Sequence, residues 1–193
     1  MSLDILIAFG YFQTFDFPNF LQSHMPALLT SPFDASDESK IMEEIDENLI
    51  LIHIRGGDYL DTVNADFGIL SSAYFEKAVR KLVNETEKSR IWVITNDRKH
   101  ADKILDSTSF EVNYILDESS KLTEFEILKL MSHCTKIVIS NSTFSWWGAY
   151  LASCRKSVHV VAPKPWFRNL QDTRSTRIPP GWDYADSIWE LNG

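Results

Sequence analysis

The chain has 193 residues, a formal net charge of −8 at pH 7, 44% hydrophobic residues and 24% charged residues. This length is enough for one full-sized hydrophobic core but short for two independent domains. The acidic balance argues against a general nucleic-acid-binding or anionic-membrane-binding surface, because both need a basic face.

The first 48 residues differ in pattern from the rest of the chain. An aromatic, proline-broken stretch follows residues 10–13, and apolar spacing then predicts a helix over 19–29. A polar loop is expected over 31–39, followed by an acidic helical stretch over 41–48. We interpret residues 1–48 as a helical lead-in segment, a remnant of or a linker to a missing N-terminal half.

From residue 49 onward, strand and helix signals alternate. Short apolar runs predict strands over 49–54, 91–94, 112–116, 137–139 and 158–161. Apolar residues at helical spacing predict helices over 71–88, 98–105, 123–134 and 144–152. Five strands joined by helices predict an α/β domain over 49–193. We expect an open, parallel, Rossmann-like sheet with helices on both faces.

In such a sheet, ligands bind beyond the carboxyl ends of the strands, and Arg55 directly follows the first predicted strand. His53 and Arg55 share one face of the strand by the two-residue period. Gly56 and Gly57 allow a tight turn that brings backbone N–H groups against a ligand, and a guanidinium can hold two phosphate oxygens. Asp58 could orient Arg55 or accept a hydrogen bond from a hydroxyl.

The alternative for this segment is structural. Arg55 and Asp58 would form an ion pair that closes the turn, and His53 would be a core residue with its hydrogen bonds satisfied. We favour the core interpretation for His53 taken alone. For Arg55 we favour ligand binding, because an arginine at the exit of a buried strand is costly without a partner.

A second polar segment, Thr95-Asn96-Asp97, follows the strand over 91–94. Asn and Asp are favoured N-cap residues, so this segment could cap the helix over 98–105. It could equally contact a ligand at the same edge of the sheet. The two roles are compatible, and both are kept.

A third polar segment spans residues 140–145 and precedes adjacent tryptophans, Trp146 and Trp147. A hydroxyl-rich turn at a helix start offers side-chain hydroxyls and backbone N–H groups to an anion. The alternative is helix capping by Ser142 or Thr143, with the tryptophans in the core. We expect core tryptophans, and we favour ligand binding by the turn because it carries more hydroxyls than capping needs.

Other chemical motifs are absent from the sequence. It has no Walker loop, no G-x-G-x-x-G, no Asp-x-Asp pair and no His/Cys cluster with ligand spacing, so we expect neither a cofactor nor a bound metal. Cys134 and Cys154 fit no disulfide framework and are expected to be buried thiols in a reducing compartment. No targeting or membrane-spanning segment is recognised. We therefore expect a cytoplasmic, bacterial protein, with association at the inner face of the membrane left open.

Two motifs together resemble the α-1,2-fucosyltransferase family, glycosyltransferase family 11. They are His53-x-Arg55-x-Gly57-Asp58-Tyr59 and the continuous stretch over residues 140–149, Ser-Asn-Ser-Thr-Phe-Ser-Trp-Trp-Gly-Ala. Residues 10–13 upstream and Pro163-x-x-Trp166-Phe167 downstream also resemble that family. The second motif is highly specific, whereas the first is shared with wider fucosyltransferase groups.

The resemblance implies transfer of fucose from GDP-fucose to a hydroxyl of a glycan acceptor, expected to be O2 of galactose. It implies inversion at the anomeric carbon, no metal, and a GT-B-like fold of which this chain resembles the C-terminal, nucleotide-sugar-binding half. Its partners would be the nucleotide-sugar donor and the glycan acceptor. A non-catalytic module that binds a GDP-sugar or a glycan, and an inverting transferase using another GDP-sugar, are the alternatives.

The resemblance also assigns residues. Arg55 would hold the donor β-phosphate. Asp58 is the candidate base by its position beside Arg55, not by the resemblance. The remaining donor-binding positions are His53, Gly57, Asn96, Asp97, Asn141, Ser142, Thr143, Phe144 and Ser145. The family motif usually carries a second arginine where this chain has Gly56.

Overall fold

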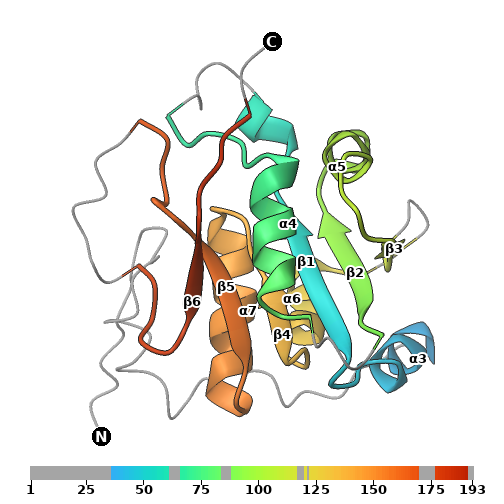
Figure 1. The fold of residues 1–193 in the computed structure, drawn as a ribbon. Coiled ribbons are helices and arrows are strands. Elements are labelled where there is room, and N and C mark those ends of the chain that lie inside the picture. The colour runs from blue at the N-terminus through green and yellow to red at the C-terminus, as the bar shows by residue number, and fades with distance from the viewer. Residues whose placement is uncertain are drawn as a thin grey trace, which may run out of the picture.

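The structure, a computed structural model, describes residues 36–60, 66–83, 88–116, 120, 122–169 and 177–190. Within these residues, strands and helices alternate along the chain (Figure 1). The strands are β1 (Leu49–Ile54), β2 (Arg90–Thr95), β3 (Asn113–Tyr114), β4 (Lys136–Val138), β5 (His159–Lys164) and β6 (Asp183–Asp186). The helices are α3 (Ser36–Glu43), α4 (Ser72–Arg80), α5 (Arg98–Leu105), α6 (Glu124–Met131) and α7 (Thr143–Arg155), with a 3-10 turn η1 (Gly57–Leu60).

All six strands form one parallel sheet in the order β3-β2-β1-β4-β5-β6. The predicted open parallel α/β sheet is therefore confirmed. From β1 the chain builds outward to β3, returns through α6, and then builds outward on the other side from β4 to β6. The direction of building reverses between β1 and β4, which makes the gap beyond their carboxyl ends the topological switch point.

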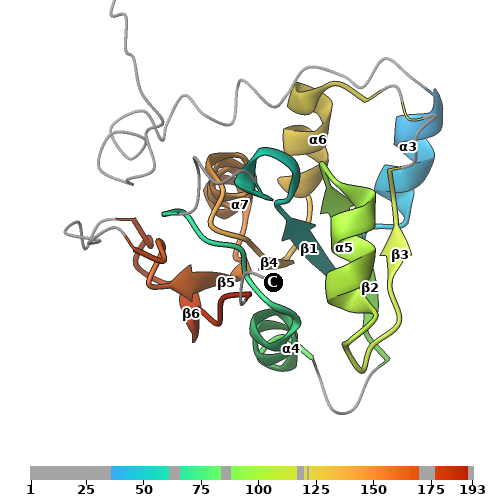
Figure 2. The same ribbon diagram turned by 90° about the horizontal axis from the view of Figure 1, so that it is seen from above.

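Helices cover both faces of the sheet (Figure 2). Leu49 and Leu51 of β1 pack in the core that includes α6 and α7. Ile50, Ile52 and Ile54 pack in the core that includes α4 and α5. Every residue of β1 is buried, which explains why this strand reads as a continuous apolar run.

The sequence missed β6, and five predicted strands become six. The segment Asp183-Tyr184-Ala185-Asp186 contains one buried residue, Ala185, so it has no apolar run to detect. β5 also continues past its predicted end at residue 161, through Pro163. Proline is tolerated there because β4 ends at Val138, so the last residues of β5 have a strand partner on one side only.

The acidic segment before β1 also differs from expectation. α3 occupies residues 36–43, so the polar loop predicted over 31–39 is wrong at its last four residues, and the helix predicted over 41–48 ends at Glu43. The carboxylate of Asp46 accepts the N–H of Asn48 at 2.9 Å, a local bond that competes with helix continuation. The division at residue 48 stays a prediction, and residues 1–35 lie outside the described residues.

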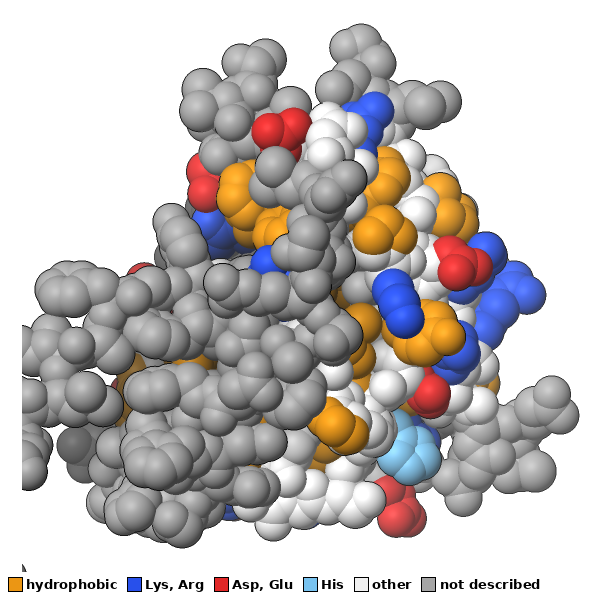
Figure 3. Space-filling model, turned by 90° about the vertical axis from the view of Figure 1, so that its left-hand side faces the viewer, with side chains coloured by type: hydrophobic (Ala, Val, Ile, Leu, Met, Phe, Trp, Pro, Cys, Tyr) orange, Lys and Arg blue, Asp and Glu red, His pale blue; other side chains and the backbone are white. Residues whose placement is uncertain are grey.

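The β6 edge carries both signs of charge. Lys77 and Asp186 form an ion pair at 3.7 Å, and the Lys164 ammonium lies 4.4 Å from the ring centroid of Tyr184. Figure 3 views the molecule from this side and shows basic, acidic and hydrophobic side chains intermixed over the coloured surface. Charged side chains on an edge strand disfavour pairing with a strand of another chain. In the described part of the chain, no helix has the length and apolar character that crossing a membrane requires.

Candidate functional site

The site predicted from sequence lies at the switch point. The turn after β1 (residues 55–60) and the turn after β4 (residues 139–142) both leave the sheet at this edge, and α7 begins there. Nδ1 of His53 lies 3.2 Å from Oγ of Ser140, and the rings of His53 and Phe144 are 5.5 Å apart. The structure therefore brings the two sequence motifs together, although they are separated by 87 residues.

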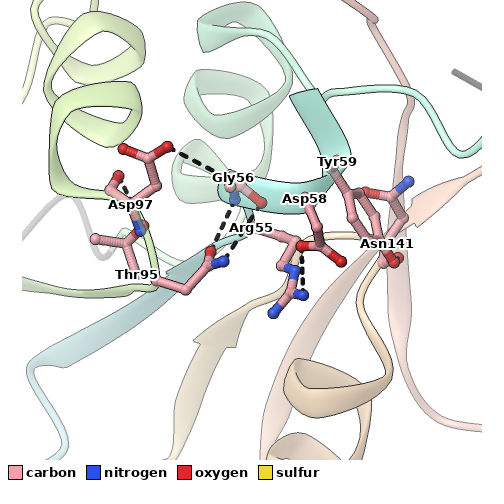
Figure 4. A network of polar contacts seen from close by, with 9 residues as sticks. Arg55, Gly56, Asp58, Tyr59, Thr95, Asp97 and Asn141 are labelled. Atoms are coloured by element: carbon pink, nitrogen blue, oxygen red, sulfur yellow. Dashed lines mark hydrogen bonds and ion pairs between the residues drawn. The ribbon is translucent and has the colours of Figure 1, made fainter. Parts of the chain in front are cut away.

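Arg55 is held by its own turn. Its Nη2 lies 2.5 Å from Oδ1 of Asp58, and its guanidinium carbon lies 5.3 Å from the ring centroid of Tyr59 (Figure 4). This confirms the ion pair that was the structural alternative. The side chain keeps 26% of its surface exposed, yet its Nε is buried and has no hydrogen-bond partner. A buried, unpaired guanidinium N–H is unfavourable unless another group completes it.

Asn96 and Asp97 hold the glycine turn from the neighbouring strand. The N–H of Gly56 donates to Oδ1 of Asn96 at 2.9 Å, and the N–H of Gly57 donates to Oδ2 of Asp97 at 3.2 Å. Gly57 has φ +61°, and a Cβ there would lie 2.7 Å from Nδ2 of Asn96. The tight glycine turn is confirmed, but both glycine N–H groups are engaged by protein side chains instead of being open to a ligand.

Asp97 is also the N-cap of α5, as one interpretation of its segment predicted. Its Oδ1 accepts the N–H of His100 at 3.0 Å, and its own N–H donates to the Thr95 hydroxyl at 3.0 Å. The hydrogen bond from His100, aided by that from Gly57, lowers the pKa of the Asp97 carboxyl, although partial burial opposes the shift. The carboxylate is thus a fixed negative charge that binds two backbone segments.

The side chain of Ser145, in the first turn of α7, supports the backbone of the turn after β4. Oγ of Ser145 is fully buried and lies 3.0 Å from the carbonyl oxygens of Ser140 and Ser142, to which it donates. Ser142 is the N-cap residue of α7 but makes no side-chain capping bond, so capping by the Ser142 hydroxyl is not observed. Trp146 is fully buried and its Nε1 donates to the carbonyl of Arg177, whereas Trp147 is half-buried. The expected core position is confirmed for Trp146.

The start of α7 supplies the remaining polar groups. The first N–H groups of a helix have no intrahelical carbonyl to bond, and they carry the positive end of the helix dipole. In α7 these include the N–H groups of Phe144 and Ser145, beside the exit of β1. This arrangement can receive an anion next to the Arg55 guanidinium.

His53 is neutral at the base of the site. Burial lowers its pKa to about 3, and the positive charge of Arg55 contributes to the lowering. A neutral imidazole can form a hydrogen bond with the Ser140 hydroxyl without adding charge to the core. The core interpretation of His53 is confirmed.

Three residues that sequence reasoning did not assign to the site complete it: Tyr59, Phe67 and Gly68. The hydroxyl of Tyr59 donates to the carbonyl of Asn141 at 3.2 Å, and the Tyr59 ring lies 5.2 Å from that of Phe67. Nδ2 of Asn141 donates to the carbonyls of Phe67 and Gly68 at 2.8 and 3.2 Å. Tyr59 belongs to the first sequence motif, which was its only signal.

The structure also bears on the two cysteines and on the expectation that no metal is bound. Cys134 is a buried free thiol whose pKa burial raises to about 12, and Cys154 is a half-buried free thiol. No three His, Cys, Asp or Glu side chains gather into a group that could hold a metal ion within the residues that the structure covers.

Comparison with known proteins supplies the family. The chain matches the family model of glycosyl transferase family 11 over residues 13–186. It is 33% identical over 132 residues to an O-antigen biosynthesis glycosyltransferase, WbnK, of Escherichia coli, covering 67% of this chain and 42% of that protein. It is 29% identical over 141 residues to an alpha-1,2-colitosyltransferase of Escherichia coli, covering 70% of this chain and 47% of that protein. The chain thus matches less than half the length of either relative, but the family match spans nearly all of its own length. This confirms the motif resemblance: the chain belongs to glycosyl transferase family 11.

Proposed function

We propose that this chain carries the donor site of an inverting glycosyltransferase that moves fucose from GDP-fucose to a glycan hydroxyl, O2 of galactose. The observation that carries the proposal is the placement of Arg55 and the start of α7 on the two sides of the switch point. A cation and a helix N-terminus at this edge suit a diphosphate. Family membership supports sugar transfer as the reaction.

The proposed chemistry fits these groups. The bond between the anomeric carbon and the β-phosphate oxygen breaks, and its electron pair stays on that oxygen of the departing GDP. The acceptor hydroxyl oxygen bonds to the anomeric carbon from the opposite face, and its proton passes to the Asp58 carboxylate or to bulk water. Negative charge therefore grows on the β-phosphate, where Arg55 and the α7 N–H groups would stabilise it without a metal.

Asp58 has two roles open to it in this proposal. Its carboxylate oxygen contacts Arg55 at 2.5 Å, which favours the role of orienting the guanidinium. Acting as the base that receives the acceptor proton would require this ion pair to open. An oxocarbenium-like reaction needs only weak base assistance, so the orienting role is sufficient.

Two other candidate functions have their own support. One relative is named as a colitosyltransferase, which favours a variant in which the same site receives a nucleotide sugar other than GDP-fucose. The carboxylate of Asp58, the candidate base, is already paired with Arg55, which favours a module that binds the donor without transferring it. Both alternatives keep the diphosphate site and differ in the fate of the bound nucleotide sugar.

Calorimetric titration of the 193-residue chain with GDP, GDP-fucose and UDP tests the donor site. We expect GDP and GDP-fucose to bind more tightly than UDP, and Arg55→Ala to weaken GDP binding by about 10- to 100-fold, because hydrogen bonds from a charged donor are lost. Arg80→Ala is the matched control: it also removes one positive charge, from an exposed residue at the end of α4. Equal GDP affinity in Arg55→Ala and Arg80→Ala would overturn the proposal.

Measuring the release of GDP during turnover distinguishes the three candidate functions. With a galactoside acceptor present, release of GDP from GDP-fucose supports the fucosyltransferase. Release from another GDP-sugar but not from GDP-fucose supports the second candidate. Tight binding of GDP-fucose with no release in the presence of galactosides supports the binding module.

A further inference from the structure

We propose that Tyr59 is a positioning residue that couples Arg55 to the start of α7, and this rests on the proposed donor site. Tyr59 lies in η1, four residues after Arg55, and is half-buried. Its ring carries the Arg55 guanidinium at 5.3 Å from the centroid, within the range of a cation–π contact. Its hydroxyl reaches the other turn of the site, at the carbonyl of Asn141 (Figure 4).

Tyr59 is one corner of a closed set of contacts that we call the Tyr59–Phe67–Asn141 triangle. The rings of Tyr59 and Phe67 pack at 5.2 Å, the Phe67 carbonyl accepts from Nδ2 of Asn141 at 2.8 Å, and the Asn141 carbonyl accepts from the Tyr59 hydroxyl at 3.2 Å. Asn141 is 2% exposed, so its corner of the triangle is fixed in the core. Each corner therefore restrains the other two.

The triangle joins the two sides of the candidate site. Asn141 immediately precedes Ser142, the N-cap of α7, so holding its carbonyl holds the start of that helix. The same tyrosine supports Arg55, whose Nε has no partner and whose Nη2 is taken by Asp58. A phosphate bridging Arg55 and the α7 N–H groups needs donors about 2.7–2.9 Å from its oxygens on both sides at once. The spacing of the two sides therefore sets its affinity.

A purely structural tyrosine would behave differently from a positioning one. Loss of a structural contact lowers the stability of the fold but leaves the affinity of the folded protein unchanged. Loss of a positioning contact weakens phosphate binding, and only while Arg55 is present to be positioned. The two roles are separated by a double-mutant cycle between residues 59 and 55.

The test uses Tyr59→Phe, which keeps the ring against Arg55 and Phe67 and removes only the hydroxyl. We expect GDP to bind about 3- to 10-fold more weakly, the equivalent of one ordinary hydrogen bond. In the Arg55→Ala background, the same change should alter GDP affinity by less than about twofold, since the coupling is then absent.

Tyr74→Phe is the matched control. The Tyr74 hydroxyl also donates to a backbone carbonyl just after β4, that of Ile139 at 2.6 Å. Tyr74 lies in α4, in the core on the α4 and α5 face of the sheet. This variant should be less stable and should keep GDP affinity within about twofold of wild type. Calorimetry gives the affinities, and urea unfolding confirms that each variant is folded.

The outcomes are distinguishable from those of the proposed function. Wild-type GDP affinity in Tyr59→Phe, or the same weakening with and without Arg55, overturns the positioning role but leaves the donor site standing. An Arg55→Ala variant that binds GDP as wild type does would overturn the donor site and the positioning role together.

Discussion

The buried side chains of His53 and Ser140 lie 3.2 Å apart and join the ends of β1 and β4 beneath the candidate site. His53 is 3% exposed and lies two residues before Arg55, and its pKa is held at about 3. Protonation would place a second positive charge beside Arg55 inside the core. The join between the two strands is therefore sensitive to acid.

We predict that His53→Gln flattens the pH dependence of stability between pH 7 and pH 5. The folded pKa of about 3 lies below the ordinary 6.5, so the unfolded chain takes up a proton first as pH falls and wild-type stability declines through this window. His53 accounts for about 2 kcal/mol of that decline by pH 5, and this part should be absent from His53→Gln. Urea unfolding at both pH values measures it. Ser140→Ala, which keeps the buried imidazole, should decline like wild type, and an equal decline in His53→Gln would contradict the prediction.

Elements that carry their own local signal were predictable. β1 matches its predicted residues 49–54 because it is buried on both faces and reads as one apolar run. α5 matches its predicted residues 98–105 because its N-cap, Asp97, stands directly before it. β6 was missed because only its pairing with β5 makes it a strand, and it has a single buried residue. Pairing partners are a property of the folded chain, and a short polar segment does not encode them locally.

The candidate site was also predictable only in part. That residues 53–58 and 140–145 lie together followed from topology, since the carboxyl ends of parallel strands share one edge. The bonds within that edge did not follow. Asn96 and Asp97 reach the glycine turn across 40 positions, and Asn141 reaches Phe67 across 74. Such bonds depend on the register between neighbouring strands and on the path of the turns that follow them. The spacing of motifs in the sequence specifies neither.

A second prediction concerns Asp97, which links α5 to the Arg55 turn. Asp97→Ala removes the cap of α5 and leaves the N–H of Gly57 without its acceptor, so we expect a loss of about 1–3 kcal/mol in the free energy of unfolding at pH 7. The folded pKa of Asp97 lies below the ordinary 3.8, so its contribution is present above that pH and is lost as pH falls through the lowered pKa. The difference between variant and wild type should therefore shrink as the pH falls through the lowered pKa of Asp97.

Asp97→Asn is the control for this prediction. The amide oxygen can still accept the N–H of His100, so this variant should recover more than half of the stability that Asp97→Ala loses at pH 7. It cannot titrate, so the acid-dependent part should disappear. Equal stability of wild type and Asp97→Ala at pH 7 would show that the link is not a stabilising one.

Gly56 stands where the family motif usually has arginine, and the surrounding side chains leave no room there for a larger residue. Gly56 is buried, and a Cβ there would lie 2.9 Å from both Cβ of Asp97 and Cδ2 of His100, closer than real Cβ contacts. Gly56→Ala should therefore lower the free energy of unfolding by about 1–3 kcal/mol through overpacking, and Gly56→Arg by at least as much, without tighter GDP binding. Urea unfolding measures both. Because the His100 ring fills part of the space, His100→Ala should reduce the effect of Gly56→Ala when the two are combined, a coupling that a double-mutant cycle detects. Full stability in Gly56→Ala, or tighter GDP binding in Gly56→Arg, would mean that the turn can move to admit a side chain.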